Sequence, residues 1–442
     1  MLNQLIDHLD KDERISGWQV RELDRRSTQL FLNKDGEEGR RKVEALTYEV
    51  EVLVTRKAAK PGAKEKTWVT GNARLNFDGQ AESGLKAQVD AAVEAASLVA
   101  NEPYAMTEVG GMVPKVDLGD PAIAEDAEAQ VVRAAEELRA AAGAEAGVRL
   151  VAGEFFAENN RVRYFNSQGV HCLSEGTFFS GEFCLLAQGP SGETEVFQAF
   201  KRRRLQDLGL AALVAESAHK SRRRGQAGLP KSGAFDVALS GEALDHFFAW
   251  CLTQSSGAAK YNRMTQAEIG DVLVQAAPGA TPLTIFHNAL IPWGVGSYKI
   301  DPSGTPGCKR LLIENGVLKA RHANARYAQY LKQAATGELA GIEVGAGKSK
   351  AADLLAPGER PLYHLSDFSY FEPNGMTGEF STEIRYGEEI SAGGMRAVKG
   401  GSLSGLTRTA LETARFSAET ETRERYLGPK VLRLENLTLS GD

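Results

Sequence analysis

The segment LSGEALDHFFAWC, residues 239–251, has residue types that a zinc peptidase helix would use. Such a helix needs two imidazoles one turn apart, so that both reach one ion, and a carboxylate that takes a proton from the bound water. Here His246 stands alone, with only Glu242 one turn before it. The seven histidines are His8, His171, His219, His246, His287, His322 and His364, and no two are spaced three, four or five residues apart. The pattern therefore favours a partly buried histidine on a packing helix over a zinc ligand.

Aromatic residues follow His246 directly, at Phe247, Phe248 and Trp250. A helix from Gly241 to Cys251 would carry them as an apolar surface that something must cover. Packing inside the carboxyl-terminal domain is the favoured interpretation, and contact with a partner protein is the alternative.

Cysteine chemistry has little local support. Cys172, Cys184, Cys251 and Cys308 form no CxxC pair, which favours free thiols in a reducing compartment. His171 and Cys172 are neighbours in a predicted strand, where adjacent side chains point to opposite faces and cannot easily share a metal. A cysteine or histidine site that forms only in the fold stays open, and with it a peptidase that is active alone.

Strands and two helices are expected in the first 142 residues. Alternation and turn residues predict strands within residues 20–76. Helical spacing predicts one helix that starts near Ser83 and ends at Pro103, and a second over residues 124–142 that stops at Gly143. The first helix has its apolar positions at Leu85, Val89, Val93, Ala96 and Ala100, and the second at Ala127, Val131, Ala134, Leu138 and Ala141.

From residue 148 to 199 the apolar period changes to two, in short runs separated by NN, NSQG and GPSG, which predicts an antiparallel meander. The basic residues over 200–224 are most simply one helix that links two domains. We expect an amino-terminal α+β domain over 1–225 and a strand-rich carboxyl-terminal domain over 226–442. No internal repeat stands out in the sequence.

Composition limits the class of protein. The 442 residues, with 42% hydrophobic and 25% charged side chains, are typical of a soluble globular chain of two or three domains. Lys and Arg number 52 against 58 Asp and Glu, a net charge of -6, which argues against nucleic acid as a partner. The first fifteen residues read as a short charged helix rather than a signal segment, and no run is long enough to span a membrane. We expect a cytoplasmic protein.

Four stretches carry a resemblance that covers most of the chain: YFNSQGVHCLSEG, SGAFDVALSGEALDHFFAW, LLIENGVLKARHANARYAQ and TGEFSTEIRYGEEISAGGMRAVKGGSLSG. In this order they resemble the TldD/PmbA family, also called modulators of DNA gyrase. The resemblance implies an α+β fold of amino-terminal sheets and helices with a strand-rich carboxyl-terminal domain.

In the catalytic branch of that family, zinc is held by an HExxxH helix and by a cysteine near the carboxyl end. Here the helix position reads ALDHFFAWC, and the final YLGPKVLRLENLTLSG has no cysteine. The chain therefore resembles the TldE/PmbA side, the non-catalytic subunit of a heterodimeric metallopeptidase that acts on unfolded peptides. The resemblance implies no cofactor in this chain, zinc in a TldD-like partner, and no contact with DNA or a membrane. A non-cleaving, chaperone-like homodimer that binds peptides is the alternative from another class.

Two groups of site residues follow from this interpretation. The degenerate active-site helix carries Glu242, His246, Phe247 and Trp250. The stretch EPNGMTGEFS is the candidate peptide-binding segment, through Asn374, Gly375, Thr377, Gly378 and Phe380, because Gly permits close backbone approach and Phe could seat an apolar side chain. A hairpin turn that leads into a strand is at least as good an interpretation of that stretch.

Overall fold

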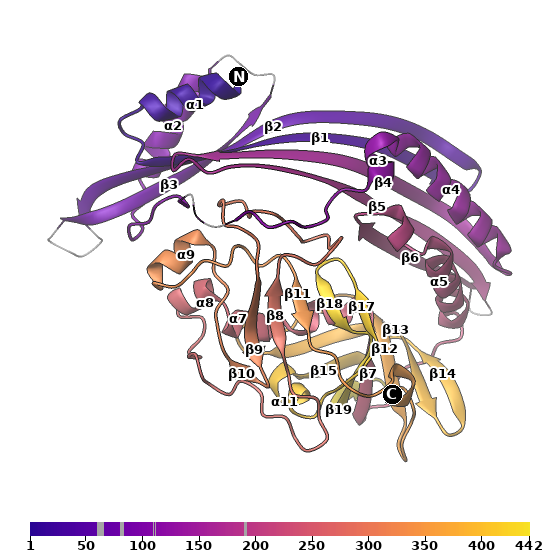
Figure 1. Cartoon of the computed structure of the whole chain (residues 1–442). Helices are drawn as coiled ribbons and strands as arrows, with labels where there is room; N and C mark the ends of the chain where they lie inside the picture. Colours follow the sequence, from indigo (N-terminus) through magenta and orange to yellow (C-terminus); the bar gives the residue numbers. More distant parts are fainter. Residues whose placement is uncertain (60–65, 80–83, 109, 111, 190–191) are drawn as a thin grey trace.

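A computed structural model of the chain describes residues 1–59, 66–79, 84–108, 110, 112–189 and 192–442 (Figure 1). Its amino-terminal part is one curved antiparallel sheet of six strands, in the order β3-β2-β1-β4-β5-β6. The strands are β1 (Gly17–Asn33), β2 (Gly36–Ala59), β3 (Lys66–Asp78), β4 (Val148–Asn166), β5 (His171–Gly189) and β6 (Gly192–Arg202).

Helices cover the convex side of this sheet in two groups (Figure 1). They are α1 (Leu2–Lys11) and α2 (Leu85–Ser97) at one end, and α3 (Pro121–Glu125), α4 (Ala127–Ala144) and α5 (Leu210–Arg224) at the other. Helix α4 begins where the Asp126 side chain accepts a hydrogen bond from the Ala129 N–H, and it buries Val131, Ala134 and Leu138 against the sheet.

The amino-terminal part contains the same unit twice. A helix, a three-stranded meander and a second helix follow one another as α1-β1-β2-β3-α2 and again as α4-β4-β5-β6-α5. The two meanders join through β1 and β4, which pair antiparallel from Gln19 opposite Asn166 to Asn33 opposite Ala152. The two copies share a topology rather than a residue pattern, so the repeat cannot be seen in the sequence.

The α+β fold is confirmed, with corrections to several elements. Residues 148–199 do form an antiparallel meander, but as three long strands, and Asn159 and Asn160 lie inside β4 rather than at a turn. The helix predicted over 200–224 is shorter, because β6 continues to Arg202 and a 3₁₀ turn (Leu205–Asp207) precedes α5. The helix predicted from 124 begins at Ala127 and passes Gly143, and Ser83 lies outside the described residues.

The carboxyl-terminal part holds two further sheets. One has the order β10-β9-β8-β11-β18-β17, and the other runs β12-β7-β19-β15-β13-β14 with β16 beside β19. An additional pairing of β12 with β13 closes part of the second sheet into a ring. The strands are β7 (Gly233–Leu239), β8 (Ile285–Asn288), β9 (Lys309–Glu314), β10 (Val317–Leu318), β11 (Ile342–Val344), β12 (Leu362–Phe368), β13 (Glu379–Ser391), β14 (Gly394–Val398), β15 (Ser402–Leu406), β16 (Arg415–Phe416), β17 (Thr420–Thr422), β18 (Tyr426–Pro429) and β19 (Leu432–Ser440).

Short helices connect these strands around a single large core. They are α6 (Ala243–Phe247), α7 (Ala249–Gln254), α8 (Gly257–Tyr261), α9 (Ala325–Tyr330), α10 (Ala351–Leu354) and α11 (Thr407–Glu412). The core joins α6 and α7 to both sheets. No helix in the described part of the chain combines the length and apolar character needed to cross a membrane.

Arg203 links the two parts of the molecule. Its buried guanidinium donates hydrogen bonds to carbonyl oxygens of Gly294 (2.7 Å), Val295 (3.2 Å) and Ser297 (2.8 Å) in the carboxyl-terminal part. It also donates to the carbonyl of Leu118 (3.1 Å) and lies over the ring of Phe178. The sheet therefore arches over the carboxyl-terminal part in an orientation that this side chain helps to fix (Figure 1).

Candidate functional site

The degenerate active-site helix is broken into two short helices. Helix α6 begins at Ala243 and ends at Phe247, and α7 begins at Ala249, with Phe248 outside helical geometry between them. Gly241 precedes α6 with a φ of +67°, a left-handed conformation that glycine adopts without the cost that a Cβ brings. The prediction of one continuous helix from Gly241 to Cys251 is therefore wrong.

The aromatic residues of this segment pack inside the protein, as the favoured interpretation predicted. Phe247 and Phe248 are fully buried, and Trp250 is nearly so. Phe247 stacks on Phe371, with ring centroids 6.3 Å apart. Phe248 stacks on Tyr426 at 6.3 Å and meets Phe416 edge to face at 6.4 Å. These rings fill the space behind α6 and α7.

The candidate peptide-binding segment lies directly against this helix pair. A Cβ on Gly375 would come within 2.4 Å of the Thr253 Oγ1, and one on Gly378 within 3.2 Å of the Trp250 ring. The Asn374 carboxamide oxygen accepts hydrogen bonds from the backbone N–H groups of Met376 (2.9 Å) and Thr377 (3.0 Å). The stretch is thus a tight turn that leads into β13.

Phe380 points into the core rather than toward solvent. It is 5% exposed and contacts Phe371, with ring centroids 5.5 Å apart. Its ring therefore supports the turn from inside, which differs from the role of seating a peptide side chain.

Residues of α6 and the residue before it face a groove between the two parts of the molecule. Glu242, Asp245 and His246 line it on one side. Opposite them lies the edge strand β6, from Glu195 to Arg202. Contrary to the sequence interpretation, His246 is exposed on this wall rather than partly buried.

Two adjoining cavities make up this interdomain groove. They share Gln198, Leu213, Glu242 and Arg423, so they are continuous. The larger has a volume of about 620 Å3. Helix α5 adds Glu216, Lys220 and Arg224 to its wall, and the loop after β7 adds Ser240. Phe197 of β6 is 60% exposed there, so a large apolar side chain faces solvent in the groove.

Buried charges concentrate at the α6 end of the groove. Asp245 Oδ2 lies 3.2 Å from Arg423 Nε. Burial raises the pKa of the Asp245 carboxyl, and Arg423 opposes that shift. Burial raises the pKa of Glu421 as well. One oxygen of each carboxyl, Asp245 Oδ1 and Glu421 Oε1, is buried without a hydrogen-bond partner. A buried acceptor without a partner in the protein is commonly satisfied by ordered water.

The residues on the groove wall do not fit a zinc site. Gly241, Glu242 and His246 have the spacing of an HExxxH motif in which glycine replaces the first histidine. The five-residue separation of Gly241 and His246 could have shown this in the sequence. Within the described residues, no three His, Cys, Asp or Glu side chains are arranged to hold a metal. One imidazole and one glutamate leave a zinc ion short of the ligands it needs.

A cysteine–histidine site in the fold finds no support at the pair that shares the Thr336 carbonyl oxygen. His287 Nε2 (3.0 Å) and Cys308 Sγ (3.6 Å) both lie near the Thr336 carbonyl oxygen. His287 is completely buried, and burial lowers its pKa to about 4. Burial also raises the pKa of Cys308, so its thiol stays protonated at neutral pH.

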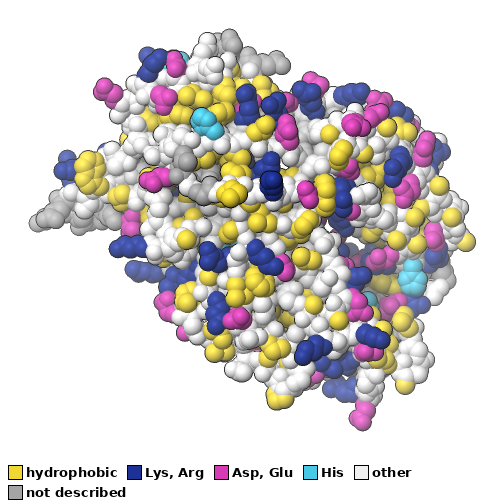
Figure 2. Space-filling view, viewed as in Figure 1, with side chains coloured by type: hydrophobic (Ala, Val, Ile, Leu, Met, Phe, Trp, Pro, Cys, Tyr) yellow, Lys and Arg dark blue, Asp and Glu magenta, His cyan; other side chains and the backbone are white. Residues whose placement is uncertain are grey.

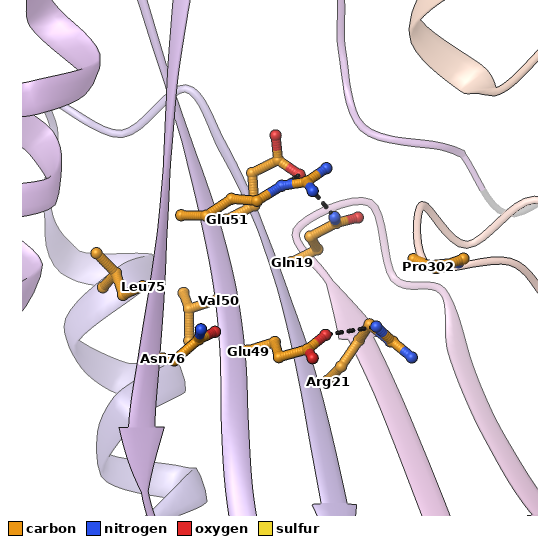
Figure 3. Close-up of a pocket in the computed structure, with 9 residues that line it drawn as sticks. Gln19, Arg21, Glu49, Val50, Glu51, Leu75, Asn76 and Pro302 are labelled. Atoms are coloured by element: carbon orange, nitrogen blue, oxygen red, sulfur yellow. Dashed lines mark hydrogen bonds and ion pairs between the residues drawn. The ribbon is translucent and has the colours of Figure 1, made fainter. Parts of the chain in front are cut away.

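A second polar pocket lies between β1–β3 and the carboxyl-terminal part, at Pro302 (Figure 3). Its charged side chains are already paired with one another. Glu51 accepts a hydrogen bond from Gln19 (2.9 Å), and Arg21 pairs with Glu49 (Figure 3). This pocket is best explained as a satisfied polar contact between the two parts.

The arginines of residues 202–204 and 222–224 all interact with the protein itself. Arg204 pairs with Asp207, Arg222 with Glu145, and Arg223 with Glu388. Arg202, Arg203 and Arg224 donate to backbone carbonyl oxygens. On the face seen in Figure 2, basic and acidic side chains alternate without a large basic patch. These arginines therefore contribute contacts within the fold.

Comparison with known proteins gives one match to a protein family. Residues 232–441 match the family described as the PmbA/TldA metallopeptidase C-terminal domain. A protein of Methanocaldococcus jannaschii, the uncharacterized MJ0231, is 22% identical over 294 residues, which cover 64% of this chain and 68% of that protein.

Solved structures share the complete fold. TldE from Thermococcus kodakarensis matches with a TM-score of 0.80 and 16% identity, over 100% of both chains. A structure from Thermotoga maritima, named for modulation of DNA gyrase, gives the same score, identity and coverage. One from Bacteroides thetaiotaomicron with a similar name has a TM-score of 0.83 and 14% identity, over 100% of this chain and 98% of that one.

Proposed function

Because the chain belongs to the TldD/PmbA family, we propose that it is the non-catalytic, TldE/PmbA-like subunit of a zinc metallopeptidase that degrades or processes unfolded peptides. In this proposal a TldD-like subunit with an HExxxH helix supplies the zinc and the reacting groups. The four free cysteines suit a reducing compartment, so we place the complex in the cytoplasm.

One observation carries the proposal: the remnant of an active-site helix lies on the wall of the interdomain groove without its first ligand. Glu242 and His246 line the groove. Gly241 has a left-handed backbone conformation that a histidine would adopt only at a cost in free energy. The rings of Phe248 and Phe416 are packed together behind this segment.

The groove suits an extended chain. Strand β6 is the last strand of its sheet, and its residues from Glu195 to Arg202 line the groove. A peptide can add to such an edge through backbone hydrogen bonds, which select for an unfolded segment with little preference for sequence.

The experiment mixes the purified chain with a TldD-like homologue that carries HExxxH. We expect the pair to cleave an unfolded peptide, a chelator to stop the cleavage, and this chain alone to leave the peptide intact. Replacing His246 by Ala should leave the zinc content of the pair unchanged and change assembly only modestly, with His8→Ala on the exposed face of α1 as the matched control.

Two outcomes would contradict the proposal. If His246→Ala abolished cleavage in a pair that still assembles and holds its zinc, His246 would have a catalytic role. If the chain bound unfolded peptide as a homodimer and gave no cleavage with any HExxxH partner, a chaperone-like peptide binder would be the better description.

A further inference from the structure

Ser240 and His364 form a hydrogen-bonded pair at the groove. Ser240 directly follows β7, and its Oγ lies 2.8 Å from Nε2 of His364 on the neighbouring parallel strand β12. Ala238 is the register partner of His364, so Ser240 lies on the same face of the sheet, two residues further along. A hydroxyl in hydrogen-bond contact with an imidazole is the basic unit of a serine nucleophile.

The strand on the other side of β12 brings a carboxylate beside His364. Glu388 of β13 is the direct register partner of His364, so the two side chains are neighbours on one face. Glu388 accepts a hydrogen bond from the Tyr386 hydroxyl (3.1 Å) and pairs with Arg223 (3.3 Å), which hold it in place. A carboxylate so placed stabilises the imidazolium that forms when a serine loses its proton.

The pair also has the access and the protonation state that the chemistry requires. Ser240 and His364 are both half-buried, and Ser240 lines the larger cavity of the interdomain groove. Burial lowers the pKa of His364, with a smaller opposing influence from Glu388, so the imidazole is neutral at physiological pH and able to accept a proton. Lys220 lines the same cavity, where it pairs with Glu216 (2.8 Å) and Asp367 (3.0 Å).

We propose that Ser240 is the nucleophile, and His364 the general base, of a metal-independent acyl-transfer site in the interdomain groove that takes carboxylic esters. Ser240 Oγ attacks the ester carbonyl carbon as its proton passes to His364 Nε2. The new C–O bond forms, the bond to the leaving alkoxide breaks, and His364 Nε2 returns the proton to the alkoxide. Water then hydrolyses the acyl-serine with the same imidazole as base.

The leaving group explains why esters rather than peptides would react. An amine is a much poorer leaving group than the alkoxide of an activated ester, so it depends more strongly on protonation by an acid as the bond breaks. An activated ester needs less of this help. The activity would therefore need neither the partner subunit nor zinc, and it goes beyond the proposed function.

The test uses the full chain alone, in the presence of a chelator. A fluorophosphonate probe and p-nitrophenyl acetate should both modify Ser240, as located by peptide mass spectrometry. Ser240→Ala should abolish this modification, and His364→Gln should slow it by about a hundredfold. Ser440→Ala is the control, because Ser440 is exposed on β19 outside this cavity, and Ser240 of that variant should react at the normal rate.

Glu388→Gln serves as a second variant if His364→Gln does not fold, and it should slow modification of Ser240 several-fold. Absence of any adduct at Ser240 in the folded protein, or equal rates in the Gln variants, would show that the Ser240–His364 hydrogen bond is structural only. Because the assay contains no partner and no metal, its failure leaves the peptidase-subunit proposal untouched.

Discussion

The rings of Phe247 and Phe380 meet edge to face, with centroids 6.2 Å apart and planes at 67°. Phe247 belongs to the remnant of the active-site helix, and Phe380 to the strand that follows the 374–378 turn. Both side chains are buried in one core. The helix and the turn are therefore a single packed unit, and a substitution in one should disturb the packing of the other.

Replacing Gly378 by Ala should destabilise the protein through this unit. The new Cβ would lie 3.2 Å from the Trp250 ring, at a φ of +78°. The backbone conformation alone should cost roughly 1–2 kcal/mol, and the contact adds to it. Gly84→Ala is the control, since Gly84 also has a positive φ but open space around it. Urea unfolding should show a larger loss for Gly378→Ala, and equal losses would contradict the Trp250 contact.

Gly241→His should not convert this chain into a zinc protein. It restores the HExxxH pattern, but a histidine at a φ of +67° is strained and a third ligand is missing. We expect less than about one zinc per chain after dialysis, for the variant and the original protein alike, by elemental analysis. Stoichiometric zinc in the original protein would overturn its assignment as the non-catalytic subunit.

Arg203→Lys should loosen the link between the two parts. Lysine cannot reproduce four hydrogen bonds to carbonyl oxygens, so buried acceptors would lose their partners, at a cost on the order of 3 kcal/mol. Arg222→Lys is the control, because Arg222 pairs with a single carboxylate, Glu145, at the surface. If both variants unfold at the same urea concentration, Arg203 is not the link described above.

His287 should make the protein less stable in acid. Its pKa is about 4 when folded, against an ordinary value of about 6.5 when unfolded. Above pH 6.5 both states are neutral; as pH falls from 6.5 to 4 the unfolded state alone takes the proton, so stability falls, by on the order of 3 kcal/mol. His287→Gln should flatten this part of the stability curve, and an unchanged slope would contradict the assignment.

Ala199→Trp should block the groove at β6. Ala199 is exposed and lines the cavity opposite His246, so an indole there would occupy the path of a peptide. We expect slower cleavage of a long unfolded peptide by the assembled pair, with assembly and zinc content unchanged. Ala146→Trp, on an exposed loop away from this cavity, is the control. Unchanged cleavage would place the peptide elsewhere.

The sequence was most informative where one period dominates a segment. Val131, Ala134 and Leu138 follow a helical spacing and are buried in α4 as predicted. The apolar alternation of residues 148–199 predicted the meander for the same reason. Asn159 and Asn160 were predicted to form a turn, because paired asparagines favour turns. In the structure, both β1 and β5 continue their pairing with β4 past these two residues.

The site depended on contacts that no local pattern encodes. The groove joins β6 to α6 across the two parts, and the Ser240–His364 pair joins two strands whose closeness follows from the sheet order. Phe380 looked available because it follows a turn, but strand alternation in β13 directs it inward. Only the position of Gly241 relative to His246 was visible in the sequence itself.

The doubled unit of the amino-terminal part has a consequence for the nascent chain. While the protein is being synthesised, β1 can pair with β2 as soon as the first meander has emerged, but its other side stays open. Asn33 can pair with Ala152, and Gln19 with Asn166, only after these residues of β4 have been synthesised. An open strand of this length invites aggregation, and charged side chains are a common protection. The run from Arg21 to Arg26, RELDRR, places such charges at the middle of the exposed edge until β4 arrives.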